Sequence, residues 1–298
     1  MKVFKLSEKD FLSLEKLIIG DGVVNTMAEL YHMPKDADEL LLVFKRITVL
    51  DDEYFANKVE TIVHLMEQEK ERAIPALVYP KGLVTIDGDL AGFAMPLVKG
   101  TNLKTYLNDP KVSYEKKKQA LIQVGNILKQ MKACREETSF NDFYLNDIHE
   151  GNFIIEDETG MVRYVDLDSC AIRGNDLDRS MYLRPVAKFR HYEEKYKYDS
   201  NGFFGSHIVP SDDTEIFSYT SMILNFIAKD NLGCLNPGQM LEYIAYLEDL
   251  GYPFDILCNF ITLYSKTKPN VNPVDLLEHL EFIPRSTYTD YLYSRRKF

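Results

Sequence analysis

The sequence predicts an α+β protein with two lobes, a small N-terminal lobe with an antiparallel sheet and one helix, and a larger, mainly helical C-terminal lobe. Apolar residues follow a strand-like pattern up to about Gly100, and a helical period dominates after it. One helical segment interrupts the first pattern, and one short hairpin interrupts the second. We therefore expect an N-terminal lobe over residues 1–99 and a C-terminal lobe over residues 100–298.

The composition is that of a folded, acidic protein. The 298 residues include 46 acidic and 35 basic side chains, which gives a formal net charge of −11, and 45% of them are hydrophobic. Binding to nucleic acid or to anionic lipid needs clustered Lys and Arg, so the charge argues against both as main partners. Residues 1–10 lack the apolar run of a secretory signal, and no stretch is apolar enough to span a membrane. We expect a cytoplasmic protein, and four scattered cysteines without a CxxC pair favour the same location.

Four strands and one helix are expected in the N-terminal lobe. Runs rich in Leu, Ile, Val and Phe predict strands at residues 17–22, 39–45, 82–86 and 91–95. Asp87 and Gly88 predict the turn between the last two strands. The helix is expected over residues 53–72, where apolar side chains fall on one stripe, namely Phe55, Val59, Ile62, Val63 and Met66.

Helices dominate the expected C-terminal lobe. A short helix is predicted at residues 103–107 and a long one at 113–134, with these side chains facing inward: Ala120, Leu121, Val124, Ile127, Leu128 and Met131. Two apolar runs, at 153–155 and 162–165, predict a small hairpin. Residues 173–210 lack a clean period and predict a long loop. Beyond it we expect helices at 215–229, 238–250, 254–264 and 273–280, and a frayed terminus at 288–298.

Three polar groups around the predicted hairpin suggest phosphoryl transfer. Asn152 follows Asp147 by five residues, and Asp166 follows Asn152 by fourteen. Phosphoryl transfer needs a carboxylate that orients the attacking hydroxyl, and an amide and a second carboxylate that hold Mg²⁺ on the nucleotide phosphates. The hairpin brings both metal ligands to one end. The alternative interpretation is a surface hairpin in which these residues only cap turns.

This pattern resembles the protein-kinase-like superfamily, whose catalytic loop is H-R-D-x-x-x-x-N and whose metal loop is D-F-G. The chain is similar to bacterial or phage Ser/Thr protein kinases over roughly residues 17–227. The resemblance implies ATP and Mg²⁺ as cofactors. It makes Asp147 the catalytic residue that orients the acceptor, and Asn152 and Asp166 the metal ligands.

The resemblance extends upstream to a lysine on a strand and an acidic residue on a helix. Residues 43–45 are similar to the V-A-I-K strand, which implies that Lys45 neutralises the α- and β-phosphates. Glu60, fifteen residues further on, is the implied ion-pair partner of Lys45, with Glu53 and Glu67 as weaker candidates. We expect Lys45 and Glu60 to act together in the catalytic machinery.

Two further segments complete the expected nucleotide site. Residues 19–27 are similar to the Gly-rich loop over the phosphates, so Gly20 and Gly22 are implied contacts, although Asn25 and Met27 replace the third Gly and the Val. Residues 93–100 are similar to the hinge between the lobes. This similarity implies that the adenine is contacted by three residues, Met95, Pro96 and Val98.

The departures from the family pattern concern the acceptor and regulation. Leu145 and Asn146 replace the His and Arg of the catalytic loop, which removes the Arg that would pair with a phosphorylated activation loop. His149 makes residues 147–152 also similar to the D-x-H-x-G-N loop of aminoglycoside and choline phosphotransferases. Asp168 replaces the Gly of D-F-G, either as a metal ligand or as a turn cap, and we favour the turn cap.

The segment after the predicted long loop favours a protein kinase. Residues 214–219 are similar to the family's D-I-W-S-L-G helix start, with Glu215 or Asp213 as its buried acid. The expected function is therefore transfer of the γ-phosphate of ATP to a Ser/Thr hydroxyl of a protein substrate. A small-molecule kinase with a hydroxylated acceptor and a nucleotide-binding pseudokinase scaffold are the alternatives. The sequence does not indicate the oligomeric state.

Overall fold

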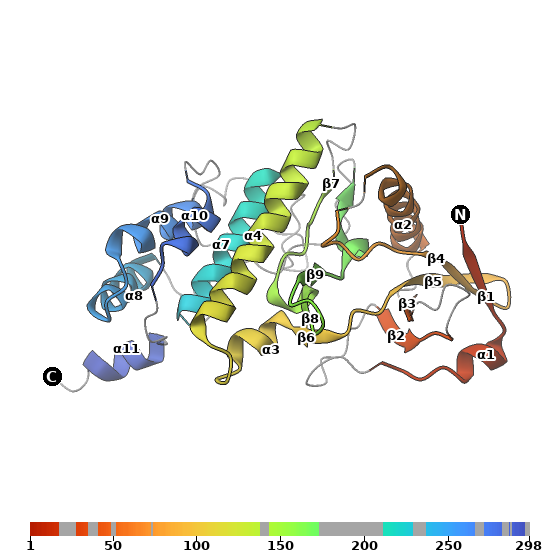
Figure 1. Cartoon of the computed structure of the whole chain (residues 1–298), viewed down its shortest axis with the longest axis horizontal. Helices are drawn as coiled ribbons and strands as arrows, with labels where there is room; N and C mark the ends of the chain where they lie inside the picture. Colours follow the sequence, from red (N-terminus) through yellow and green to blue (C-terminus); the bar gives the residue numbers. More distant parts are fainter. Residues whose placement is uncertain are drawn as a thin grey trace, which may run out of the picture.

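The structure of this chain is a computed structural model, which describes residues 1–17, 28–34, 41–48, 52–72, 74–137, 143–172, 211–228, 237–265, 271–281, 286 and 288–295. Within these ranges the protein is a mixture of helices and strands, in agreement with the predicted α+β class. The strand-rich part comes first along the chain and the helix-rich part follows it, so that β1 and α11 lie at opposite ends of the molecule (Figure 1).

A five-stranded sheet forms the N-terminal part. Its strands stand in the order β1-β4-β5-β3-β2, and they are β1 (Val3–Leu6), β4 (Gly82–Ile86), β5 (Asp89–Pro96), β3 (Leu42–Ile47) and β2 (Ala28–His32). The sheet is mainly antiparallel, as expected, and the parallel pairing of β1 with β4 is its one exception among the described strands. Two parallel strands need a long connection between them, and 75 residues lie between Leu6, the end of β1, and Gly82, the start of β4.

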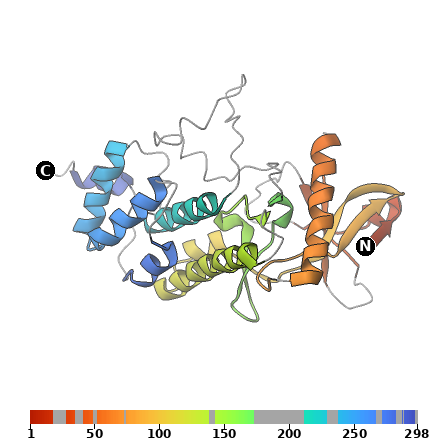
Figure 2. The same ribbon diagram turned by 90° about the horizontal axis from the view of Figure 1, so that it is seen from above.

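The two faces of this sheet are covered by two helices, where the sequence predicted one. The short helix α1 (Glu8–Leu12) places Phe11 against one face, in contact with Phe44 and the neighbouring side chains of that face. The long helix α2 (Asp52–Arg72) covers the other face, where Ile62 and Leu65 pack in the same core as Phe93 (Figure 2). The unpredicted α1 begins with a capping box, in which Ser7 and Asp10 satisfy each other's backbone N–H groups.

A three-stranded sheet follows the first part along the chain and leads into the helical part. The sheet has the order β6-β8-β9, with β6 (Gly100–Asn102), β8 (Phe153–Glu156) and β9 (Val162–Tyr164). The hairpin of β8 and β9 confirms the one predicted from the two apolar runs. Two strands that the sequence did not predict, β7 (Phe143–Tyr144) and β10 (Ala171–Ile172), pair beside it.

The helical part is built on two adjacent helices, α4 (Tyr114–Glu137) and α7 (Asp212–Ala228). All six side chains predicted to face inward from α4 are buried. Gly125 allows close packing there, because a Cβ atom at this position would come within 2.1 Å of Val274 Cγ2 and 2.7 Å of the Tyr219 hydroxyl oxygen. The remaining helices are α3 (Leu103–Asn108), α8 (Pro237–Asp249), α9 (Phe254–Ser265), α10 (Pro273–Glu278) and α11 (Tyr288–Arg295).

The last of these helices replaces the frayed terminus that the sequence suggested. Tyr291 of α11 is buried, and it contacts Tyr243 and Tyr246 of α8 with ring centroids 6.3 and 5.3 Å apart. This aromatic packing holds an eight-residue helix that is too short to be stable in isolation. Across the described residues, no helix is long and apolar enough to cross a membrane.

Candidate functional site

Lys45 lies in the middle of β3 with a paired strand on each side. Its Cα is opposite Leu30 of β2 and Phe93 of β5, so the backbone is fixed from both directions. The residue is only 6% exposed. Its ammonium group lies 2.5 Å from Asp166 Oδ1 and 2.6 Å from Asp168 Oδ1. The structure therefore brings the predicted phosphate-binding lysine directly to the predicted metal-binding carboxylate, across 121 positions of sequence.

The hairpin of β8 and β9 brings Asn152 and Asp166 to one end, as the sequence predicts. The one-turn helix η1 (Glu150–Asn152) precedes β8, and the one-turn helix η2 (Leu167–Ser169) follows β9. The pairing continues past the strands, because Val165 donates its N–H to Asn152 O at 3.0 Å. Asp166 occupies the position just before η2 and accepts a 2.6 Å hydrogen bond from the Ser169 hydroxyl.

Asp147 and Asn152 are held together by hydrogen bonds. The Asn152 side-chain amide donates to Asp147 O at 2.9 Å and to Asp147 Oδ2 at 3.3 Å. Both hydrogen bonds use the NH₂ group of Asn152. They therefore fix the orientation of the side-chain amide and leave its carbonyl oxygen as the atom that could bind a metal. The buried Tyr164 hydroxyl also donates to Asp147 O at 3.3 Å. The backbone of Asp147 is thus fixed from two sides.

His149 orients the carboxylate of Asp147. Its Nδ1 accepts a hydrogen bond from Gly151 N–H at 3.0 Å, so Nε2 carries the proton of the neutral ring. That Nε2 lies 3.4 Å from Asp147 Oδ2. Burial lowers the pKa of His149, but the hydrogen bond and charge of Asp147 outweigh burial and raise the pKa above its usual value. The residue that departs from the protein-kinase pattern therefore contacts the proposed catalytic group.

Lys45 and Asp166 each stabilise the charged form of the other. Burial acts against both charges, and the mutual attraction of the two groups outweighs it. The carboxylates of Asp166 and Asp168 raise the pKa of Lys45, and Lys45 holds the pKa of Asp166 well below its usual range.

Lys58 and Asp168 are members of this cluster that the sequence did not assign to it. Asp168 is 4% exposed and contacts Lys45, so our preference for a turn cap at this position was wrong. Lys58 of α2 is 3% exposed, and its ammonium donates to Asp168 O at 2.7 Å and lies 3.5 Å from Asp168 Oδ2. A lysine on a helix is usually solvent-exposed, so nothing around Lys58 indicated that it is buried. The only sequence feature that pointed to an additional cation was the second carboxylate, Asp168, two positions after Asp166.

Glu60 does not reach Lys45 in this structure. Glu60 is exposed on α2, and the two carboxylates that contact Lys45 are those of Asp166 and Asp168. Glu60 follows Lys58 by two positions, which is about 200° around a helix, so the two side chains lie on different faces. Glu67 is also exposed, and the side chain of Glu53 lies outside the described residues. In place of the expected pair with a helical glutamate, Lys45 contacts Asp166 and Asp168.

The expected hinge residues connect β5 to β6. Met95 and Pro96 end β5, where they lie opposite Val43 and Leu42 of β3. Val98 follows in the connection, and its backbone N–H and C=O take part in none of the hydrogen bonds formed between described residues. Val98 therefore has both backbone groups available for a ligand, as adenine binding at a hinge requires.

Two expected features fall outside the described residues. The Gly-rich segment with Gly20, Gly22, Asn25 and Met27 is one of them, and the long loop at 173–210 is the other. The proposed phosphate contacts of Gly20 and Gly22 stay predictions.

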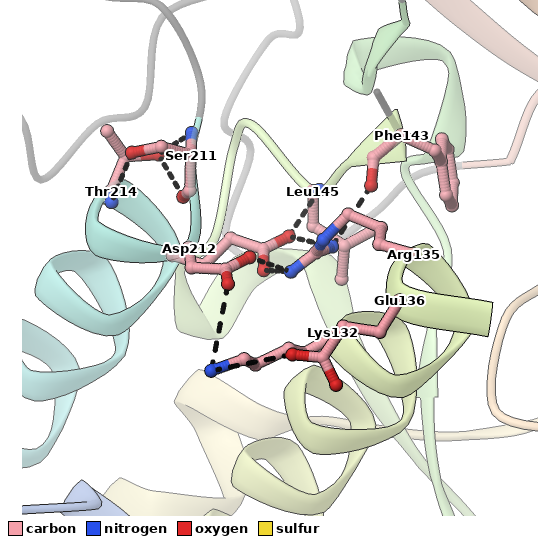
Figure 3. A network of polar contacts seen from close by, with 9 residues as sticks. Lys132, Arg135, Glu136, Phe143, Leu145, Ser211, Asp212 and Thr214 are labelled. Atoms are coloured by element: carbon pink, nitrogen blue, oxygen red, sulfur yellow. Dashed lines mark hydrogen bonds and ion pairs between the residues drawn. The ribbon is translucent and has the colours of Figure 1, made fainter. Parts of the chain in front are cut away.

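A buried network anchors the segment that leads into Asp147. Glu215 of α7 accepts a hydrogen bond from Leu145 N–H at 2.8 Å, and its other oxygen lies 2.7 Å from Arg135 Nη2 of α4. Arg135 also contacts Asp212 at 2.6 Å and donates to Phe143 O at 3.0 Å (Figure 3). Of the two acids predicted for this role, Glu215 is the one that binds the loop, and it is 2% exposed.

The oxygen groups present suit a hard cation that is also bound by phosphates. Among the described residues, no three His, Cys, Asp or Glu side chains come together as a metal site. Mg²⁺ is commonly held by one or two protein oxygens together with substrate phosphates and water. Asp166 and the amide oxygen of Asn152 fit that pattern. No protein-family model matches this sequence, and comparison with curated proteins gives no significant match.

Proposed function

We propose that the chain is an ATP- and Mg²⁺-dependent phosphotransferase with a two-lobed protein-kinase-like fold, which moves the γ-phosphate to a hydroxyl. The contact between Lys45 and Asp166 is the observation that supports it most. These two residues belong to separate motifs whose function requires them to meet, and their charged atoms lie 2.5 Å apart. A chance similarity of short motifs gives no reason for two residues 121 positions apart to meet.

The proposed roles follow from the groups that each residue offers. Lys45 would turn from the carboxylates to the α- and β-phosphates of the nucleotide. Asp166 and Asn152 would hold Mg²⁺, which supplies charge neutralisation on the phosphates. Asp147 would accept a hydrogen bond from the acceptor hydroxyl and set its direction of attack, while His149 and Asn152 hold the Asp147 carboxylate in place.

The acceptor is proposed to be a Ser or Thr side chain of a protein. The supporting observation is Glu215, which binds Leu145 N–H from the first turn of α7 as the buried acid of the protein-kinase pattern does. His149 favours a second candidate, a small hydroxylated molecule, because it occupies the position found in aminoglycoside and choline phosphotransferases. The cytoplasmic location stays a prediction from the sequence.

A nucleotide-binding pseudokinase is the candidate of another class. It is favoured by the exposed position of Glu60 and by the ion pairs that the ammonium group of Lys45 already forms with two carboxylates. A pseudokinase would bind nucleotide without transferring phosphate. The two candidates therefore differ in transfer and agree in binding.

The test is a transfer assay with γ-labelled ATP and Mg²⁺. The wild-type protein is incubated with generic protein acceptors and, separately, with small hydroxyl compounds. We expect label on protein, lost with Asp166→Asn and reduced about 10²–10⁴-fold with Asp147→Asn. Asp157→Asn, in the exposed turn of the same hairpin, is the matched control and keeps full transfer. Label on small molecules alone would select the second acceptor, and binding without transfer would select the pseudokinase.

A further inference from the structure

Four charged side chains form one buried cluster, and only half of the cluster belongs to the proposed nucleotide site. Lys45 and Asp166 have roles in it, whereas Lys58 and Asp168 do not. Lys58 and Asp168 have opposite charges and are more deeply buried than Lys45 and Asp166, at 3% and 4% exposed. They connect two elements, since Lys58 lies on α2 and Asp168 lies in η2, and these elements pack against each other.

The charges of the cluster balance in pairs. In the structure Asp168 has two cationic neighbours, Lys45 at 2.6 Å and Lys58 at 3.5 Å. If Lys45 turns to phosphates and Asp166 binds Mg²⁺, Lys58 is the cation that stays beside Asp168 within the described part of the chain. A buried carboxylate without a partner is strongly destabilising, so Lys58 becomes essential in the loaded state.

Lys58 also contacts the backbone of Asp168. Lys58 donates to Asp168 O at 2.7 Å, which fixes the main chain of η2 as well as its side chain. Asp166 occupies the position just before the same one-turn helix, and only Leu167 lies between the two aspartates. A displacement of Lys58 would therefore move the carboxylate proposed to hold Mg²⁺.

We propose that Lys58 and Asp168 form a fixed ion-pair link between α2 and the metal loop, with Lys58 as a positioning residue for Asp166. This inference rests on the proposed function. The link takes the structural place expected of Glu60, with the charge of the helix residue reversed. In this arrangement α2 contacts the metal loop directly through Lys58. Lys45 is then able to leave Asp166 and Asp168 and bind the phosphates. The position of α2 thereby sets the geometry of the metal site.

The test compares Lys58→Met with Lys58→Arg and with a control on the same helix–sheet interface. Lys81→Met is that control, because Lys81 pairs with Glu69 of α2 in a partly exposed ion pair away from the cluster. Two quantities are measured as Mg²⁺ is titrated: nucleotide binding by calorimetry with ADP, and transfer rate with ATP. Melting temperatures identify variants that do not fold.

We expect Lys58→Met to weaken the apparent Mg²⁺ affinity about 10–100-fold, the usual loss when a residue that orients a metal ligand is removed. ADP binding without Mg²⁺ should weaken less than Mg²⁺ affinity does, because Lys45 and the hinge are still present and no metal has to be held. Lys58→Arg recovers most of the Mg²⁺ affinity, and Lys81→Met leaves it at the wild-type value. A role in packing alone would lower stability and leave the Mg²⁺ dependence of the folded fraction unchanged, which would overturn the proposal.

A second variant keeps the test decisive if Lys58→Met does not fold. Asp168→Asn keeps the size of the side chain and the backbone oxygen that Lys58 contacts, and removes the charge. It should weaken Mg²⁺ affinity, and Lys58→Met should cost less in the Asp168→Asn background than in the wild-type protein, because the charged part of the link is already gone and only the backbone contact remains to be lost. Fully additive losses, or unchanged Mg²⁺ affinity in Asp168→Asn, contradict the link. Wild-type protein that binds no nucleotide contradicts the proposed function itself.

Discussion

Lys45 has a pH-dependent effect on stability, because it sets the ionisation of Asp166. The pKa of Asp166 is depressed in the folded protein, so its contribution to stability is present above its unfolded pKa of about 4 and is lost as the pH falls further. Burial acts to raise the pKa of Asp166, and Lys45→Met removes the main group that opposes burial, while Ser169 and Lys58 remain. We predict a cost of about 3–5 kcal/mol at pH 7 that becomes smaller at pH 4, measured by urea unfolding at several pH values.

The control for this effect is an exposed lysine in a single ion pair. Lys129 pairs with Asp275 at 3.3 Å, and both side chains are exposed. Lys129→Met should cost less than about 1 kcal/mol at every pH. A cost of Lys45→Met that is equal at pH 4 and pH 7 would show that Asp166 does not depend on Lys45 for its charge.

Single residues of the candidate site were predictable where a motif fixes their type and spacing. Asp147, Asn152 and Asp166 stand at intervals that phosphoryl-transfer chemistry explains, and the structure places them at one end of a hairpin. Lys58 was not predictable, because nothing in its helical segment distinguishes a buried lysine from an exposed one. Its burial depends on Asp168, which is 110 positions away.

The junction of α4 and α7 tests how the helices hold the segment before Asp147. Arg135 is buried and contacts both Glu215 and Asp212, so Arg135→Met leaves the buried Glu215 without its cation. We predict a loss of about 3–5 kcal/mol in the free energy of unfolding. Faster hydrogen exchange of the Leu145 amide should accompany it, because Glu215 accepts that N–H.

Lys132 provides the matched control on the same helix. Its ammonium lies 3.8 Å from Asp212 and 4.0 Å from Glu136, and its side chain is exposed (Figure 3). Lys132→Met should change the free energy of unfolding by no more than about 0.5 kcal/mol. Similar effects of the two substitutions would mean that the network is not an anchor of the loop.

Elements were predictable in proportion to their length and period. The sequence located α2, α4 and the β4–β5 hairpin to within a few residues, because each repeats a pattern over many positions. It missed β1, whose pairing partner β4 lies far away in sequence, and β2, in which the alternation of apolar and polar residues is weak. It also missed α11, which depends on contacts with α8 that no local pattern encodes.

The whole molecule combines the two parts through the same residues that the proposed nucleotide would bind. Lys45 comes from the five-stranded sheet, and Asp166 follows the hairpin that belongs to the second sheet. Asn102, where the connection between the parts ends, donates its side-chain amide to Gly151 O at 2.7 Å. Ligands that contact Lys45 and Asp166 together should therefore stabilise the fold as a unit.

The dependence of that stabilisation on Mg²⁺ is the last prediction. A ligand at 100 times its dissociation constant stabilises a protein by about 2.7 kcal/mol, which for a chain of this size raises the melting temperature by about 4 °C. We expect this shift with ADP and Mg²⁺, and a much smaller one with ADP and a chelator, because free phosphates would meet the negative charge of Asp166 and Asp147. In Asp166→Asn the two shifts should become similar, since the carboxylate that needs the metal is gone. Equal shifts with and without Mg²⁺ in the wild-type protein would remove Asp166 and Asn152 as metal ligands.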